Sequence, residues 1–256
     1  MLESRQPDDV HSSGTLVLEH GQYSPSHQHE RGHLAYPATG ILSVTTSEGT
    51  WVAPSNRAAW TPGGFQHQHR AYGRTDMRVL FLPPTIGDAL PRRPAVLVVS
   101  SLAREVFLAL TGPAWRQAGI RRHLQHVLVD ELAIVPERPL RLPRPADDRL
   151  RAVADLLHAD PADSSTLPEL GRAVGTSART LSRLFHEELG MSFRHWRTQL
   201  RLHHSLLLLA NDRSITATAH ACGWSNPSSF IDAFTAVLGQ TPGQYQDQRT
   251  RTPERP

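Results

Sequence analysis

The stretch GTSARTLSRLFHEELG, residues 175–190, repeats apolar residues at spacings of three and four, which predicts an amphipathic helix. Its inner face would carry Leu181, Leu184 and Phe185. Its outer face would carry Arg179, Ser182 and Arg183. Ser177 stands at an N-cap position, and Gly175 lies in a turn after a shorter apolar-periodic segment. The pattern predicts a helix-turn-helix unit whose second helix is held by its apolar side and exposes polar side chains.

The same plan recurs about fifty residues later, in SITATAHACGWSNPSSFIDAFTAVLG, residues 214–239. A helix through Ala217 and Ala221 meets Gly223, and Asn226 then caps a helix that starts with Pro227. Between the two units, residues 192–210 predict a helix of roughly 17 residues, about 26 Å long. Two such units could enter successive major grooves, about 34 Å apart. A single pattern of this kind can be merely two packed helices, but the duplication favours DNA binding.

Arginine placement supports a polyanionic partner. All 27 basic residues are arginine, and the formal net charge is +3. Between residues 171 and 211 the only acids are Glu187 and Glu188, against six arginines: Arg172, Arg179, Arg183, Arg194, Arg197 and Arg201. A local basic surplus suggests nucleic acid, although an arginine run can also be a solvated helix face.

The C-terminal hundred residues resemble the DNA-binding domain of the AraC/XylS transcriptional regulators. The matching features are ARTLSRLF, ACGWSNPSSF and the closing LGQTPGQY, so the resemblance covers both units and their spacing. It implies base contacts from Arg179, Ser182, Arg183, Ser228, Ser229 and Asp232. It implies phosphate contacts from Arg194, Arg197, Arg201, Thr180 and Asn226. Asp232 departs from the family, which often has a basic residue there. A carboxylate meets phosphate repulsion unless it accepts from cytosine N4, so we expect the second unit to be the weaker reader.

The first 84 residues contain short extended runs such as GTLVLEH and RVLFLPP, separated by turn residues, and these predict an antiparallel barrel or sandwich. The histidines in SHQHERGH, residues 26–33, and PGGFQH, residues 62–67, have spacings that resemble the two motifs of the cupin barrels. The first motif matches well and the second partially. The resemblance implies a pocket lined by His27, His29, His33 and His67.

Two interpretations of these histidines stay open. His27 and His29 share one side of a strand and, with His33 and His67, could bind a divalent metal ion. The favoured alternative is an effector pocket without metal, because AraC-type regulators commonly carry a cupin-like sensor barrel. His69 is expected at the surface or a strand edge. We expect core packing of Tyr36, Trp51 and Trp60.

The middle of the chain predicts a helical connector. Residues 96–112 and 120–135 have helical apolar spacing. In the second segment a stripe near coiled-coil spacing predicts dimerisation, with packing on its own barrel as the alternative. The stripe consists of Ile120, Leu124, Val127, Leu128 and Leu132. Four prolines in residues 136–148 predict an interdomain linker.

The sequence therefore predicts an α+β protein with an all-α C-terminal domain that contains two helix-turn-helix units. The expected boundaries are a cupin-like barrel over 1–90, a connector over 91–135, the linker over 136–148, the DNA-binding domain over 149–246 and a flexible tail over 247–256. No apolar run approaches the roughly 20 residues of a membrane span, and a single cysteine, Cys222, fits a reducing compartment. We expect a cytoplasmic protein without a membrane partner, in which Cys222 is buried.

The predicted function is a non-enzymatic transcriptional regulator that binds promoter DNA, senses a small-molecule effector and forms a homodimer, with RNA polymerase as a further possible partner. The one cofactor that the histidines suggest is a divalent metal ion in the cupin-like barrel. The alternative is a metal-dependent cupin enzyme with a structural helical tail, and a further alternative is a DNA-binding protein whose barrel only dimerises. The two arginine-bearing helical units favour the regulator, since an enzyme has no use for them.

Overall fold

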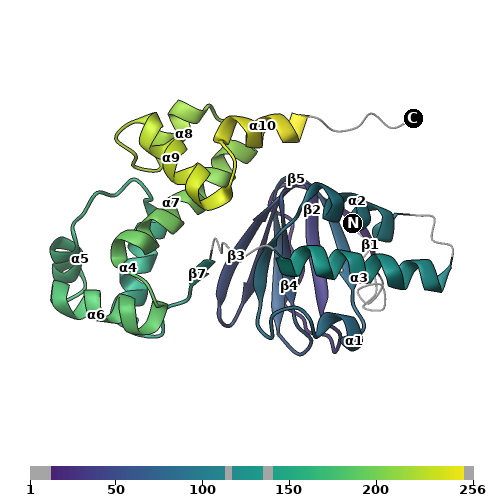
Figure 1. The fold of residues 1–256 in the computed structure, drawn as a ribbon. Coiled ribbons are helices and arrows are strands. Elements are labelled where there is room, and N and C mark those ends of the chain that lie inside the picture. Colours follow the sequence, from purple (N-terminus) through teal and green to yellow (C-terminus); the bar gives the residue numbers. More distant parts are fainter. Residues whose placement is uncertain (1–12, 113–116, 135–140, 251–256) are drawn as a thin grey trace, which may run out of the picture. The chain divides into compact units, whose positions relative to one another are not determined.

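The computed structural model describes residues 13–112, 117–134 and 141–250, and forms two compact units (Figure 1). The N-terminal unit comprises residues 13–46 and 51–134, and the C-terminal unit comprises residues 47–50 and 141–250. A sheet with covering helices followed by a mainly helical region confirms the α+β class. Residues 136–140 of the predicted linker and 251–256 of the predicted tail lie outside the described residues. Within these ranges, no helix is long and apolar enough to cross a membrane.

The N-terminal unit is built on an antiparallel sheet. β1 pairs with β5, β5 with β2, and β4 with both β2 and β6. The strands are β1 (Gly14–Leu18), β2 (His33–Thr46), β3 (Gly49–Pro54), β4 (Arg57–Thr61), β5 (His67–Phe81) and β6 (Ala95–Val98). β6 occupies residues for which the sequence predicts the start of a helix. That expectation is wrong because the apolar run over residues 95–98, buried up to Leu97, is equally compatible with a buried strand.

The sheet is strongly curled. A straight strand of the length of β5 would span about 45 Å. Yet His67 and Phe81, at its two ends, both lie beside His33, with ring centroids 4.7 and 5.5 Å from the His33 ring. The register between β2 and β5 shifts on both sides of Thr39, near Gly40 and Gly73, which have φ of 80° and 72°. The pairings among the described strands form an open path, so a closed barrel is not observed.

Helices cover one face of this sheet (Figure 1). They are α1 (Pro84–Gly87), α2 (Ser101–Thr111) and α3 (Ala118–Ile134). Leu34 and Tyr36 on β2 pack with Phe107 of α2 and Leu128 of α3, whereas Ala35 belongs to a second apolar cluster on the opposite face. This alternation along β2 is the period of two expected of a strand that is buried on both faces. Tyr36, Trp51 and Trp60 are buried, as predicted.

The stripe predicted for dimerisation divides into two sets on α3. Leu128 and Leu132 are buried in the core of their own unit, and Leu124 packs against that core. Ile120 and Val127 remain 46% and 39% exposed. The coiled-coil interpretation is therefore wrong for the buried leucines, because the helix uses them to cover its own sheet.

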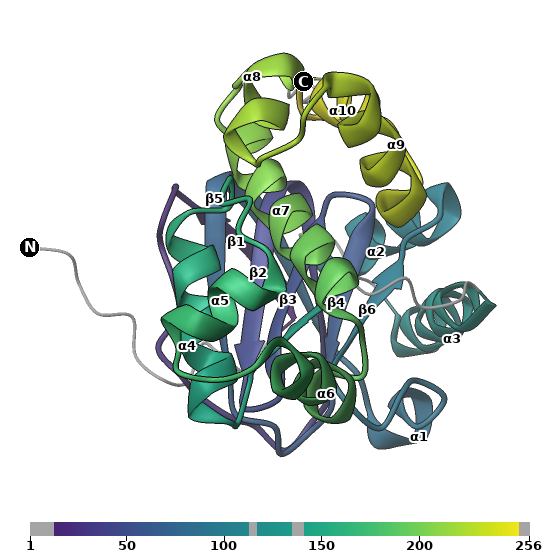
Figure 2. The same ribbon diagram turned by 90° about the vertical axis from the view of Figure 1, so that its left-hand side faces the viewer.

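The C-terminal unit is helical apart from β7 (Arg141–Pro143) and residues 47–50. Its helices are α4 (Asp148–Ala159), α5 (Leu167–Ala173), α6 (Ala178–Leu189), α7 (Phe193–Ala210), α8 (Ile215–Ala221), α9 (Pro227–Leu238) and α10 (Pro242–Thr250). The pairs α5–α6 and α8–α9 lie toward the two ends of α7 (Figure 2). Gly175 and Gly223, in the two turns, have φ of 69° and 75°. Cys222 is buried, as predicted.

A substitution at Gly63 would test how tightly the segments that carry the histidines pack together. A Cβ at Gly63 would lie 1.9 Å from the carbonyl oxygen of Glu30, and the neighbouring Gly64 N–H donates to the His29 carbonyl at 2.9 Å. We expect Gly63→Ala to lower the free energy of unfolding by about 1–3 kcal/mol, as overpacking against backbone does. The measurement is urea unfolding, with Gly14→Ala as control because nothing lies within 4 Å of its Cβ position. Equal stability of the two variants would contradict this packing.

Candidate functional site: an arginine-bearing helix and a histidine cluster

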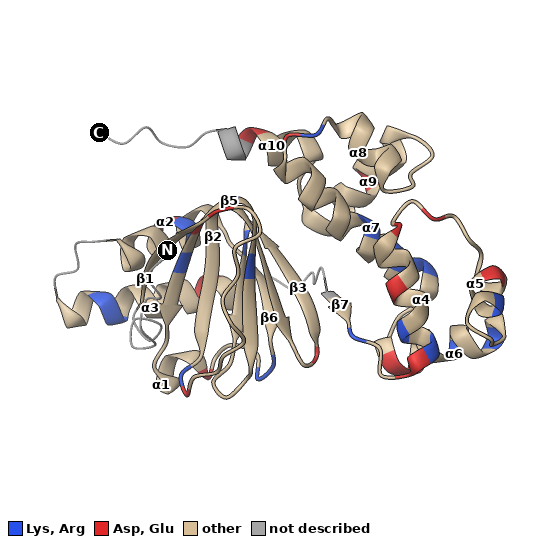
Figure 3. Ribbon diagram, turned by 180° about the vertical axis from the view of Figure 1, so that it is seen from behind, with Lys and Arg blue, Asp and Glu red and all other residues tan. Residues whose placement is uncertain are grey.

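The first candidate site is the exposed face of α6. Leu181, Leu184 and Phe185 are buried, as predicted. The Ser177 hydroxyl caps the helix by accepting from the Thr180 N–H at 3.1 Å. A surface hollow of about 420 Å³ is lined by Arg179, Thr180, Ser182, Arg183 and His186. The arrangement leaves hydrogen-bonding side chains exposed on a helix that is fixed by its apolar side. Figure 3 shows the basic residues on this part of the chain.

Two features of α6 were not predicted from its periodicity. His186 joins the exposed face because it lies one turn after Ser182. Arg183 forms an ion pair with Glu187, four residues further along the helix, and both side chains are more than half exposed. An exposed ion pair of this kind contributes little free energy, so Arg183 can leave Glu187 for another partner.

The second helix pair presents a different surface. Asn226 caps α9 by accepting from the Ser229 N–H at 2.8 Å, as predicted. Ser228, Ser229 and Asp232 are exposed, and α9 contains no basic residue. Among the described residues, no salt bridge involves Asp232. The exposed face of α9 therefore carries two serines and a carboxylate, whereas that of α6 carries two arginines.

The arginines of α7 divide by exposure. Arg194 is exposed. Arg201 donates to the carbonyl oxygens of Pro161 and Asp163, at 3.1 and 3.0 Å. Arg197 donates to the Ser165 carbonyl and lies over the Phe193 ring, 4.3 Å from its centroid. Burial lowers the pKa of both half-buried guanidinium groups. These two arginines hold the loop between α4 and α5 against α7, a structural role that the sequence did not indicate.

The second candidate site is a cluster of five histidines in the N-terminal unit. His33 lies at the start of β2, His67 and His69 lie on β5, and His27 and His29 come from the segment before β2. Ring centroids are 4.3 Å apart for His27 and His67 and 4.5 Å apart for His29 and His33. The structure therefore brings the four predicted histidines together. His27 does so through an isolated bridge to His67 rather than on a continuous strand.

His69 is part of the same cluster. It is buried, and its Nε2 lies 3.4 Å from Nε2 of His33. The expectation of a surface or strand-edge position is therefore wrong. The signal was available in the sequence, because His67 and His69 are two residues apart and so share a face of β5.

Burial favours the neutral form of three histidines of the cluster. Desolvation, followed by repulsion from the neighbouring histidines, lowers the pKa of His33 and His69 well below its usual range. Desolvation also lowers the pKa of His67 to about 4. A neutral imidazole keeps one nitrogen lone pair, so at pH 7 these three rings can accept hydrogen bonds or bind a metal ion.

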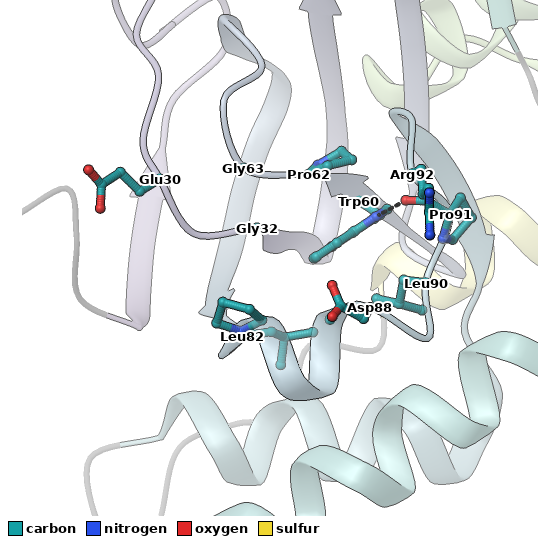
Figure 4. A pocket seen from close by; sticks show the side chains of 12 residues that line it. Glu30, Gly32, Trp60, Pro62, Gly63, Leu82, Asp88, Leu90, Pro91 and Arg92 are labelled. Atoms are coloured by element: carbon teal, nitrogen blue, oxygen red, sulfur yellow. Dashed lines mark hydrogen bonds between the residues drawn. The ribbon is translucent and has the colours of Figure 1, made fainter.

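A separate pocket of about 440 Å³ lies around Trp60 (Figure 4). The Trp60 Nε1–H donates to the Pro91 carbonyl at 2.8 Å, which fixes the indole ring. Asp88 lies beside the ring, and Glu30 points away from it (Figure 4). The cluster histidines do not line this pocket, so the hollow surface and the histidines are two distinct features of the N-terminal unit.

These features define the class of protein: a helix-turn-helix protein with a separate N-terminal unit. Residues 170–248 match a helix-turn-helix domain family. The chain is 31% identical over 250 residues to the HTH-type transcriptional regulator NimR of Escherichia coli, covering 95% of this chain and 91% of that protein. It is 41% identical over 111 residues to the HTH-type transcriptional regulator RipA of Corynebacterium glutamicum, covering 43% of this chain but 32% of that protein.

Solved structures of such regulators are also similar. ToxT from Vibrio cholerae matches 94% of this chain and 98% of its own, at 11% identity and a TM-score of 0.42. An AraC-type regulator structure from Chromobacterium violaceum matches 41% of this chain and 95% of its own, at 28% identity and a TM-score of 0.38. Neither score reaches 0.5, so the assignment rests on the sequence matches. The chain belongs to the HTH-type transcriptional regulators of the AraC type. It is a DNA-binding regulator of transcription rather than an enzyme, which confirms the predicted function and resemblance.

The structural role of Arg201 leads to a prediction. Arg201→Met keeps the apolar stem but loses the donors to Pro161 and Asp163. We expect the free energy of unfolding of the C-terminal unit to fall by about 1.5–3 kcal/mol, the range for a hydrogen bond that involves a charged group. Denaturant unfolding of the full chain checks this, with exposed Arg194→Met as the matched control. Unchanged stability together with a weaker salt dependence of DNA binding would place Arg201 on phosphate instead.

Proposed function

We propose that the chain binds promoter DNA sequence-specifically through two helix-turn-helix units, with α6 and α9 as recognition helices in successive major grooves. The observation that carries the proposal is the exposed face of α6, where Arg179, Ser182 and Arg183 surround a hollow on a capped helix with a buried apolar seam. Arginine can donate two hydrogen bonds to guanine O6 and N7. Thr180, Asn226 and Arg194, which are at helix starts or exposed on α7, contact phosphate.

The two units read DNA unequally. The face of α6 carries two arginines, whereas Asp232 on α9 is an exposed carboxylate. A carboxylate near phosphates is repelled unless it accepts from a donor such as cytosine N4. Ser228 and Ser229 can contact either base type or phosphate. The half-site bound by α6 therefore tolerates few base changes, and the half-site bound by α9 tolerates more.

The N-terminal unit, with a cupin-like sensor domain over residues 1–90 and a connector over 91–135, senses a small effector. The support is the concentration of imidazole donors at His27, His29, His33 and His67, of which the last three are buried. An effector acts by binding one arrangement of the protein better than another, which changes DNA affinity by linkage. The regulator works in the cytoplasm, where it reaches promoter DNA and RNA polymerase.

Selection of bound sequences from a random DNA pool tests the function. The full chain should enrich sites with two half-sites about one helical turn apart, one of them more strictly defined than the other. The N-terminal unit alone should enrich none. Failure of the full chain to enrich any sequence would overturn sequence-specific binding.

Arg183 gives the sharpest single variant. Arg183→Ala should reduce discrimination between the selected site and random DNA by about 1–3 kcal/mol, the value of one good arginine–guanine contact. Fluorescence anisotropy with both DNAs provides the measurement. Arg74→Ala, which removes an exposed arginine from β5 of the N-terminal unit, controls for the lost charge. Equal loss in the two variants would contradict a base contact by Arg183.

Homodimerisation is proposed through the part of α3 that is not used by its own core. Ile120 and Val127 are exposed there. The double variant Ile120→Glu, Val127→Glu should halve the sedimenting mass of the wild-type dimer, because charge in an apolar contact is costly. Leu156→Glu, an exposed leucine of α4, is the matched control. A double variant that keeps the dimer mass would exclude this face.

A further inference from the structure

The histidine cluster is too tightly packed for an organic ligand between its rings. Ring centroids are 4.7 Å apart for His33 and His67, 4.9 Å for His29 and His67, and 5.1 Å for His67 and His69. At these separations neighbouring rings are in van der Waals contact. A single ion, in contrast, is held by nitrogens only a few ångströms apart.

Hydrogen bonds fix which nitrogens are available. Nδ1 of His27, His29 and His67 each contact a carbonyl oxygen two residues away: those of Pro25, Arg31 and Phe65, at 2.8, 2.6 and 2.9 Å. A carbonyl only accepts, so in each ring Nδ1 carries the hydrogen and Nε2 keeps its lone pair. The same arrangement orients histidines that bind metals in proteins.

Two ring nitrogens of the cluster are buried without a partner. Nε2 of His67 and Nδ1 of His33 are both inaccessible to solvent and make no hydrogen bond. A buried polar atom in this state costs free energy unless something binds it. Because Nδ1 of His67 holds the hydrogen of that ring, its Nε2 carries a lone pair, and the partner that it lacks is a hydrogen-bond donor or a cation.

We propose that this cluster binds one first-row transition-metal ion, with His67 as the central ligand, and that the ion is the effector of the regulator. Two sets of three ligand atoms lie within 4.8 Å of one another: His27, His67 and His69, and His29, His33 and His67. His67 belongs to both. The structure thereby gives His69, which lies outside the motif spacings, a role as ligand.

The donor chemistry selects the metal class. Both sets consist of imidazoles alone, which suit zinc, copper, nickel or iron, whereas calcium and magnesium prefer oxygen ligands. Imidazole binds a metal ion through a nitrogen lone pair, and the hydrogen bonds made by Nδ1 leave Nε2 of His27, His29 and His67 for that role.

Titration of the metal-stripped full chain with Co²⁺ tests the site, because visible absorption reports both stoichiometry and ligand geometry. We expect one Co²⁺ per chain in the wild type and at least about 100-fold weaker binding in His67→Gln, more than the loss of an outer-shell partner costs. His126→Gln, an exposed histidine of α3, should bind like the wild type. Equal Co²⁺ binding by wild type and His67→Gln would overturn the site.

A second variant and a second measurement guard against misfolding. His69→Gln should also weaken Co²⁺ binding, while its circular dichroism matches that of the wild type. A 100-fold excess of Zn²⁺ over its Kd should raise the Tm of the N-terminal unit by about 5 °C or more in the wild type but not in His67→Gln. A wild-type Tm that does not respond to Zn²⁺, Ni²⁺ or Co²⁺ would also overturn the site.

The regulatory part rests on the proposed DNA binding and is measured separately. Affinity for the selected DNA should change at least about fivefold between the stripped and metal-loaded chain, and should not change in His67→Gln. Unchanged DNA affinity in a chain that demonstrably holds the ion would overturn its role as effector. If neither the stripped nor the metal-loaded chain bound DNA specifically, the result would count against the proposed function and not against the metal site, because metal binding is measured without DNA.

Discussion

The bend of the β2–β5 pair is the constraint on which the N-terminal unit depends. A Cβ at Gly40 would lie 2.4 Å from Oγ1 of Thr75 and 2.6 Å from the carbonyl oxygen of Arg74, and the positive φ at Gly40 and Gly73 disfavours other residues. Because the strands turn sharply here, the two ends of β5 approach the same histidine, His33. In a flat sheet the imidazoles would be solvated individually, and their pKa values would stay near the usual range. The curl therefore creates both the proximity of the donors and the burial that lowers the pKa of His33, His67 and His69.

In the C-terminal unit the corresponding constraint is the division of each helix into a buried and an exposed side. Leu181 and Phe185 fix α6, so that Arg179 and Arg183 stay exposed. On α7 the same division turns Arg197 and Arg201 toward backbone carbonyls of the preceding loop. The number of arginines consequently overstates the basic surface that can face DNA. On α6, in contrast, Arg179 and Arg183 lie on an exposed face, where Arg183 forms an exposed ion pair with Glu187.

Local patterns predicted the features that depend on neighbours in sequence. The faces of α6, the caps at Ser177 and Asn226, and the class of the fold follow from helical spacing and backbone chemistry within one or two turns. The features that were missed depend on long-range packing. The sequence of β6 fits a helix or a buried strand, and only the pairing with β4 decides between them. Similarly, the spacing of Leu128 and Leu132 is that of a dimer interface, and only the packing of α3 on its own sheet shows that these leucines belong to the core of the unit. His69 shares a face of β5 with His67, as their spacing indicates, but its burial depends on the long-range curl of β5.

A cluster of imidazole donors from three chain segments also explains how an ion could regulate the molecule. The segment before β2, the start of β2 and the start of β5 converge only in the curled arrangement, so an ion that needs all three stabilises that arrangement over any in which they separate. The stabilisation grows with ion concentration as RT ln(1 + [L]/Kd). It alters transcription only to the extent that the curled and relaxed arrangements differ in DNA affinity, and DNA binding must then change ion affinity by the same factor. An organic effector in the Trp60 pocket would leave the imidazole lone pairs unsatisfied, whereas an ion satisfies them, and this difference in chemistry favours the ion as the ligand of the cluster.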